Sequence, residues 1–141
     1  MRRYQRCWPT FCLLFAVAVV LSGCSCLQKK SLSAEAEYGF VHMVFFYWSD
    51  EANSAQKEQL IQDCFNYLGS VETVRNIEVG RPAGTPREVV DNTYGVCLIV
   101  YFDDKEGHDY YQKADEHLEF IARNQETWAR VQVYDMLPFS R

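Results

Sequence analysis

Two stretches of the chain carry apolar residues at almost every position, which is typical of strands buried on both faces of a sheet. Residues 94–102 form an almost unbroken run of β-branched and aromatic residues between two acidic turn sequences. Residues 40–48 place apolar side chains on both alternating sets of positions. Because a strand alternates its side chains between the two faces, these stretches predict two central strands of one sheet.

Two further stretches alternate apolar with polar residues, as half-exposed strands do. Residues 72–80 place Ile77 and Val79 on one face, and residues 129–136 repeat the pattern. Between the second and third strands, residues 80–92 contain two prolines and two glycines, which predicts an irregular loop. Loops of this length are often functional.

A helix is predicted after the first strand. Asn53 or Ser54 can cap it, because either side chain can accept a free backbone N–H of the first turn. Apolar residues then recur every three or four positions as far as Leu68. Gly69 suits the left-handed residue that ends many helices.

A second helical region is predicted after the third strand. Asp103 and Glu106 have the spacing of a capping box and predict a short first segment. A break at residues 113–115 separates it from a second segment, for which Asp115 is the expected cap. One stripe is expected on that segment, made of Leu118, Ile121, Ala122, Gln125 and Trp128.

The element order βαββαβ predicts an α+β fold with a ferredoxin-like antiparallel sheet, in which strands one and three are central. Two helical regions can cover only one face of such a sheet. The other face of the central strands is also apolar, and an apolar patch of that size is an association site. Face-to-face packing of two sheets about a symmetry axis buries the patch most simply, so we expect a homodimer.

The first 23 residues have the composition of a secretory signal. Residues 1–9 carry three arginines and no acid, and an apolar run follows that ends in small residues before Cys24. That run is shorter than the about 20 residues that span a bilayer. The sequence Leu21-Ser22-Gly23-Cys24 resembles the bacterial lipobox, which implies an acylated Cys24 and a membrane anchor in the bacterial cell envelope. Cys26 lacks an equivalent leucine.

These features divide the 141 residues into four parts. Residues 1–23 are the predicted signal peptide, and residues 24–38 are polar and lack periodicity, which indicates a flexible tether. Residues 39–137 form a single domain, and residues 138–141 are a short C-terminal tail.

Charge and motifs exclude several classes of function. Loss of the signal, with its three arginines, would leave 11 basic and 19 acidic residues, which opposes the basic surface that nucleic-acid binding requires. The sequence contains no phosphate-binding loop, nucleophile elbow or paired-carboxylate motif. We therefore expect no nucleic-acid partner and no cofactor.

The cysteines and histidines are candidates for cross-links and metal ligands. An exported chain can form disulfides, and a bridge between Cys64 and Cys97 is one alternative. Each lies within an apolar pattern, where a cysteine is usually a small buried hydrophobic residue. The three histidines show no paired ligand spacing, so we expect no metal site.

Three segments together carry a resemblance to a known family. They are Val41-His42-Met43-Val44-Phe45-Phe46, then Glu78-Val79-Gly80-Arg81-Pro82 with Thr85-Pro86-Arg87-Glu88-Val89-Val90-Asp91-Asn92, and Trp128-Ala129-Arg130-Val131-Gln132-Val133-Tyr134-Asp135. With these segments the domain resembles the stress-responsive α/β-barrel (Dabb) family of the dimeric α+β barrel superfamily. The resemblance implies a dimer whose two sheets form a barrel, with a pocket in each subunit between sheet and helices.

The resemblance also implies candidate site residues. Some members are stress-induced, and a plant member, olivetolic acid cyclase, closes a polyketide by an aldol reaction without a metal. Its pocket residues correspond by position to His42, Tyr111 and His117. A neutral histidine can remove a proton from carbon next to a carbonyl, while a tyrosine hydroxyl stabilises the enolate oxygen.

Three functions are open at this point. The first hypothesis is a lipid-anchored homodimer that binds a small hydrophobic or aromatic compound in each subunit. The second is a lyase or polyketide-cyclase-like enzyme with His117 as base, assisted by His42 and Tyr111. The third is a structural stress protein with a filled interior, in which His42 is a buried polar residue, Tyr111 belongs to the core and His117 lies on the surface.

Overall fold

The computed structural model describes residues 38–139. Along the chain the elements are β1 (Phe40–Trp48), α1 (Ser54–Asn66), the 3-10 helix η1 (Leu68–Ser70), β2 (Asn76–Gly80), β3 (Val96–Phe102), α2 (Lys105–Tyr111), α3 (Asp115–Asn124) and β4 (Trp128–Met136). The predicted signal peptide, the lipidation site Cys24, most of the predicted tether and the last two residues lie outside the described residues. Within residues 38–139, no helix has the length and apolar character needed to cross a membrane.

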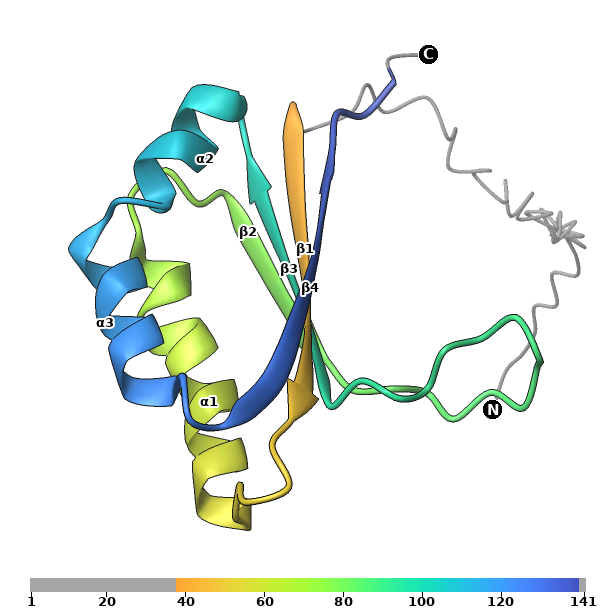
Figure 1. Cartoon of the computed structure of the whole chain (residues 1–141). Helices are drawn as coiled ribbons and strands as arrows, with labels where there is room; N and C mark the ends of the chain where they lie inside the picture. Colours follow the sequence, from red (N-terminus) through yellow and green to blue (C-terminus); the bar gives the residue numbers. More distant parts are fainter. Residues whose placement is uncertain (1–37, 140–141) are drawn as a thin grey trace, which may run out of the picture. The chain divides into compact units, whose positions relative to one another are not determined.

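The four strands form one antiparallel sheet in the order β2-β3-β1-β4. Its central strands are β1 and β3, the two apolar stretches of the sequence, which confirms the predicted ferredoxin-like fold (Figure 1). In this register His42 is paired with Val100 on one side and with Asp135 on the other. The register therefore places His42 of the central strand β1 beside Asp135 of the edge strand β4.

The helices lie on one face of the sheet, as predicted (Figure 1). Burial alternates along β1 and β3, and the buried set, which includes Phe46 and Leu98, faces the helices. Leu60 of α1 and Phe120 of α3 belong to the same hydrophobic core. Cys64 also lies in this core, and its thiol is free, as is that of Cys97, so the alternative of a bridge between them is not realised.

The other face of the sheet carries the second apolar set of the central strands. Met43 and Phe45 of β1 and Cys97, Ile99 and Tyr101 of β3 are partly exposed there. Among the described residues no helix covers this face (Figure 1). Both faces of the central strands are therefore apolar, and one of them is open.

The start of α1 agrees with the sequence and its end does not. Asn53 Oδ1 accepts the N–H groups of Ala55 and Gln56, and the Gln56 side chain accepts the Asn53 N–H, which completes a capping box. The prediction of a left-handed Gly69 was wrong, since among the described glycines only Gly84 has a positive φ. Gly69 lies instead inside η1, where the tighter 3-10 turn ends the helical segment.

The caps of α2 and α3 also differ from the prediction. Asp104, not Asp103, caps α2 by accepting the Gly107 N–H at 2.8 Å. Asp103 pairs instead with Arg75, at 2.7 Å. Asp115 is the first residue of α3 rather than its cap. The sequence alone cannot distinguish two adjacent aspartates as caps. Here the contact of Asp103 with Arg75 leaves Asp104 as the cap.

The predicted stripe on α3 was wrong in its orientation. Leu118 is half exposed, whereas Phe120 and Asn124 are buried. The Asn124 amide donates to Asp63 of α1 at 3.0 Å and to the Phe120 carbonyl at 2.9 Å. A polar residue with these two acceptors can occupy the buried face, which the apolar pattern alone did not indicate.

The irregular loop between β2 and β3 spans residues 81–95, because β3 begins two residues later than the sequence predicted. It extends away from the ends of the strands (Figure 1). Within it, the Asn92 side chain accepts the Gly84 N–H at 3.2 Å and donates to the Thr85 carbonyl at 3.0 Å. These contacts tie the two arms of the loop together.

Candidate functional site

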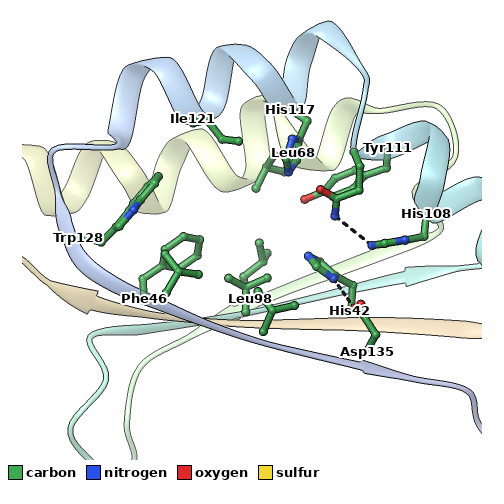
Figure 2. A pocket seen from close by; sticks show the side chains of 14 residues that line it. His42, Phe46, Leu68, Leu98, His108, Tyr111, His117, Ile121, Trp128 and Asp135 are labelled. Carbon is green, nitrogen blue, oxygen red and sulfur yellow. Dashed lines mark hydrogen bonds and ion pairs between the residues drawn. The ribbon is translucent and has the colours of Figure 1, made fainter.

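A cavity of about 460 Å³ lies between the sheet and the helices that cover it (Figure 2). One end is polar and is lined by His42, His108, Tyr111, Gln112, His117 and Asp135. The remainder is apolar and is lined mainly by Phe46, Leu68, Leu98, Ile121, Trp128 and Val131. A concave, mostly apolar site with a few polar groups at one end is the usual form of a small-molecule pocket.

His42 enters the polar end from β1 and is paired with Asp135 of β4. The distance from His42 Nδ1 to Asp135 Oδ1 is 2.6 Å, and His42 is only 5% exposed. Burial lowers the pKa of His42, and the Asp135 carboxylate offsets part of that effect by stabilising the protonated ring. The carboxylate also fixes the orientation of the ring, as in catalytic His–Asp pairs.

His108 lies beside His42, in a position to which the sequence analysis gave no role. It is 9% exposed, and its ring centroid lies 4.5 Å from Phe40 and 4.9 Å from His42. Its Nε2 atom lies 3.0 Å from the Gln112 amide nitrogen. The chain therefore brings two imidazoles together at the polar end.

Tyr111 and His117 line the side of the pocket formed by the helices. Tyr111 is 1% exposed, and its ring lies 4.7 Å from His117 and 6.0 Å from His42. Burial raises the pKa of Tyr111, so its hydroxyl stays protonated as a hydrogen-bond donor. Burial, with smaller effects from the two other histidines, lowers the pKa of His117 to about 4. His117 Nδ1 is buried and has no hydrogen-bond partner among the described residues.

The three residues predicted from the sequence, His42, Tyr111 and His117, therefore lie in one pocket. The sequence analysis missed His108 and Asp135. Asp135 follows Val131 and Val133 at two-residue spacing on β4, and that period places it on the same face of the strand. For His108 the sequence holds no comparable signal, because it lies on a short helix whose orientation the tertiary packing decides.

Three side chains at the polar end could hold a metal ion. His42, His108 and Asp135 each offer one ligand atom, and these atoms lie within 4.8 Å of one another. The sequence analysis expected no metal site because histidine spacing showed no motif. Ligands from three separate elements produce no such spacing.

The fold and the pocket define a class of protein: a ferredoxin-like α+β domain with a cavity between its sheet and its helices. A sequence model of the stress responsive A/B barrel domain matches residues 40–138, which is most of the chain. The chain belongs to this family. No curated protein matches it in sequence.

Solved structures share the fold. A dimeric ferredoxin-like protein of unknown function from Thermobifida fusca is 20% identical with a TM-score of 0.62, over 72% of this chain and 92% of that chain. A Dabb family protein with a ferredoxin-like fold from Mesorhizobium loti is 18% identical with a TM-score of 0.59, over 71% and 96%. A hydroxynitrile lyase from Passiflora edulis is 16% identical with a TM-score of 0.63, over 71% and 93%. Structural neighbours of this chain thus include dimeric proteins and an enzyme.

Proposed function

We propose that the protein binds a small, largely apolar or aromatic compound that carries one hydrogen-bonding group, such as a carbonyl or hydroxyl. The observation that carries the proposal is the division of the cavity into a polar and an apolar end. The aromatic surfaces of Phe46 and Trp128 can stack against a ring, while His42 and Tyr111 can hydrogen-bond an oxygen. A cavity of about 460 Å³ also favours this function over a structural protein with a filled interior.

A matched pair of variants on α3 tests the binding. Ile121 lines the cavity, whereas Leu118 on the same helix lies outside the lining and is 52% exposed. A library of phenols, aromatic ketones and short lipids is added to the purified protein, and the melting temperature is followed. We expect at least one class to raise it in the wild type and in Leu118→Trp, and to have no effect in Ile121→Trp. A library without any effect on the wild type contradicts the proposal.

A second candidate function is acid–base catalysis on the bound compound, which the His42–Asp135 pair favours. One of the structural neighbours is a hydroxynitrile lyase. His42 is oriented by a carboxylate 2.6 Å away, while His117 has a pKa of about 4 and is a weak base at neutral pH. On these properties we propose His42 rather than His117 as the base, with Tyr111 as the donor to the developing oxyanion.

The assay for this candidate offers aromatic hydroxynitriles and linear polyketones to the protein. If His42 is the base, His42→Gln abolishes turnover, while His117→Gln retains a measurable fraction of it. Tyr111→Phe lowers the rate by about tenfold to a hundredfold, because one oxyanion donor is lost. If His117→Gln abolishes turnover while His42→Gln retains it, His117 is the base instead.

We further propose that two copies associate through the open face of the sheet. The exposed apolar set of β1 and β3 supports this arrangement, and structural neighbours of the chain are described as dimeric. Ile99→Lys places a charge at the centre of that face, and we expect it to convert a dimer into a monomer in light scattering. The control Leu118→Lys, on the helical side, leaves the mass unchanged. A monomeric wild type contradicts the proposal.

The N-terminal sequence supports a lipid anchor at Cys24, in the bacterial cell envelope. The proposal rests on Leu21-Ser22-Gly23-Cys24 after a basic and apolar leader. Mass spectrometry of the mature protein tests it: an acylated Cys24 is expected as the first residue. Cys24→Ser moves the protein out of the membrane fraction, while the neighbouring Cys26→Ser does not. Retention of Cys24→Ser in the membrane contradicts acylation at this residue.

A further inference from the structure

Three side chains of different elements meet at the polar end of the cavity: His42 of β1, His108 of α2 and Asp135 of β4. One ligand atom from each lies within 4.8 Å of the others. The two imidazole rings are adjacent, with centroids 4.9 Å apart, and Asp135 is in hydrogen-bond contact with His42. Figure 2 shows the three side chains gathered at this end, away from the apolar lining.

The chemistry of these groups matches a divalent transition-metal ion. Two imidazole nitrogens and one carboxylate oxygen form a ligand set for Zn²⁺, with bonds of about 2.0–2.2 Å. Ligand atoms around a tetrahedral ion lie about 3.3 Å apart. The three atoms lie within 4.8 Å of one another, so side-chain rotations would have to bring the more distant of them closer to reach that spacing. Both histidines are buried, which restricts how far their rings can move.

The nitrogen of His108 that would bind the ion is hydrogen-bonded to the Gln112 side chain in this structure. The Gln112 amide nitrogen lies 3.0 Å from His108 Nε2 and donates to it, so the ring proton is on Nδ1. On that side the Asp109 carboxylate lies 3.4 Å away. A carboxylate behind the imidazole is the usual partner of a metal-bound histidine, and it leaves Nε2 for the metal once Gln112 moves aside.

Asp135 supplies both charge and access. Its side chain is 45% exposed, whereas that of His42 is 7% exposed. An ion can therefore meet the carboxylate from solvent before it contacts the buried imidazoles. The negative charge also offsets part of the cost of bringing a dication into the cavity.

We propose that His42, His108 and Asp135 bind one divalent transition-metal ion, with Zn²⁺ as the best match to the ligands. The remaining coordination positions face the cavity, where water or an oxygen of a bound compound completes the set. The site does not depend on the proposed organic ligand, because the metal ion alone is the probe. It is an alternative to the role of His42 as a base, because a metal-bound imidazole that also contacts Asp135 has no nitrogen left to take up a proton. It adds a Lewis-acidic group to a pocket whose sequence contains no metal motif.

The test uses the full-length protein in mild detergent, stripped with a chelator. Zn²⁺ is titrated by calorimetry, and Co²⁺ by its visible d–d absorption, which reports coordination number. We expect one ion per chain and the intense bands of four- or five-coordinate Co²⁺. Asp135→Asn and His108→Ala each weaken Zn²⁺ binding by about tenfold or more. The control Asp91→Asn, which makes the same change at an exposed carboxylate outside the cavity, keeps wild-type affinity.

Three results would overturn the site. One is Zn²⁺ affinity that is unchanged in Asp135→Asn. Another is a six-coordinate Co²⁺ spectrum like that of the buffer. The third is loss of binding in Cys97→Ser, which would assign the ion to a thiol. Because Asp135 is partly exposed on an edge strand, Asp135→Asn and the Co²⁺ spectrum of the wild type decide the question even if His108→Ala does not fold.

Discussion

His42 Nδ1 lies 2.6 Å from Asp135 Oδ1, and the two residues are register partners on adjacent strands. The contact joins a buried imidazole of a central strand to a partly exposed carboxylate of an edge strand. It orients the histidine that has the central role in the proposed pocket. His42 and Asp135 are also two of the three ligands in the proposed metal site. Variants of Asp135 therefore affect both the orientation of His42 and the binding of a metal ion.

The first prediction concerns the stability that this contact provides. Asp135→Ala leaves His42 Nδ1 buried without its acceptor, so the free energy of unfolding should fall by about 1–3 kcal/mol. Asp135→Asn keeps an oxygen acceptor at the same position and should lose less than about half as much. Urea denaturation at neutral pH, in the presence of a chelator, measures both. Equal losses in the two variants would show that the hydrogen bond is not the stabilising element.

The second prediction concerns pH. The pKa of His117 falls to about 4 in the folded chain, mainly through burial, from an ordinary value of 6.5. The unfolded chain therefore binds the proton at higher pH than the folded chain does. The stability contributed by neutral His117 is complete above about pH 6.5 and is lost as the pH falls through about 4. Tyr111, His42 and His108 face the ring, and His42 shifts in the same direction.

His117→Phe should reduce the slope of melting temperature against pH in this window and leave the contribution of His42. The ring signals of His117 in an NMR titration provide the direct measurement. A midpoint near 6.5 would contradict the assignment of a desolvated ring.

The third prediction concerns Gly95, the loop residue directly before β3. A Cβ atom at this position would lie 2.1 Å from Nε1 of Trp48, so the indole must move. Gly95→Ala should lower the free energy of unfolding by about 1–3 kcal/mol and shift the tryptophan emission. Gly80→Ala is the matched control, because a Cβ there has no neighbour within 4 Å. A stable Gly95→Ala with unchanged fluorescence would contradict the close packing of this strand on Trp48.

The fourth prediction concerns the contact between α1 and α3. Asp63 is 4% exposed and accepts hydrogen bonds from Arg123 Nε at 2.9 Å and from Asn124 Nδ2 at 3.0 Å. Asp63→Ala removes both bonds from a buried site and should cost about 2–4 kcal/mol. Asp103→Ala removes an exposed pair with Arg75 and should lower the free energy of unfolding by much less. If the two variants lose similar free energies of unfolding, the contacts of Asp63 stabilise the fold no more than an exposed ion pair does.

Caps and buried polar contacts show where sequence patterns reach their limit. Asn53, one of the two caps that the sequence predicted, is the cap, and its hydrogen-bond partners lie within three residues along the chain. Asp103 and Asp104 are indistinguishable at this level, and the contact of Asp103 with Arg75, 28 positions away, decided between them. Asn124 lies on the buried face of α3, contrary to the prediction, because its amide donates to Asp63, which lies 61 positions earlier.

The sequence by itself determined the ferredoxin-like fold, because the two strands apolar on both faces had to occupy the centre of the sheet. It also indicated His42, Tyr111 and His117 through the family resemblance, and all three line one cavity. Only the tertiary structure placed His108 and Asp135 beside His42. Strand register and the packing of a short helix decide those contacts, and both depend on residues far apart in the chain, so no local pattern of residues encodes them.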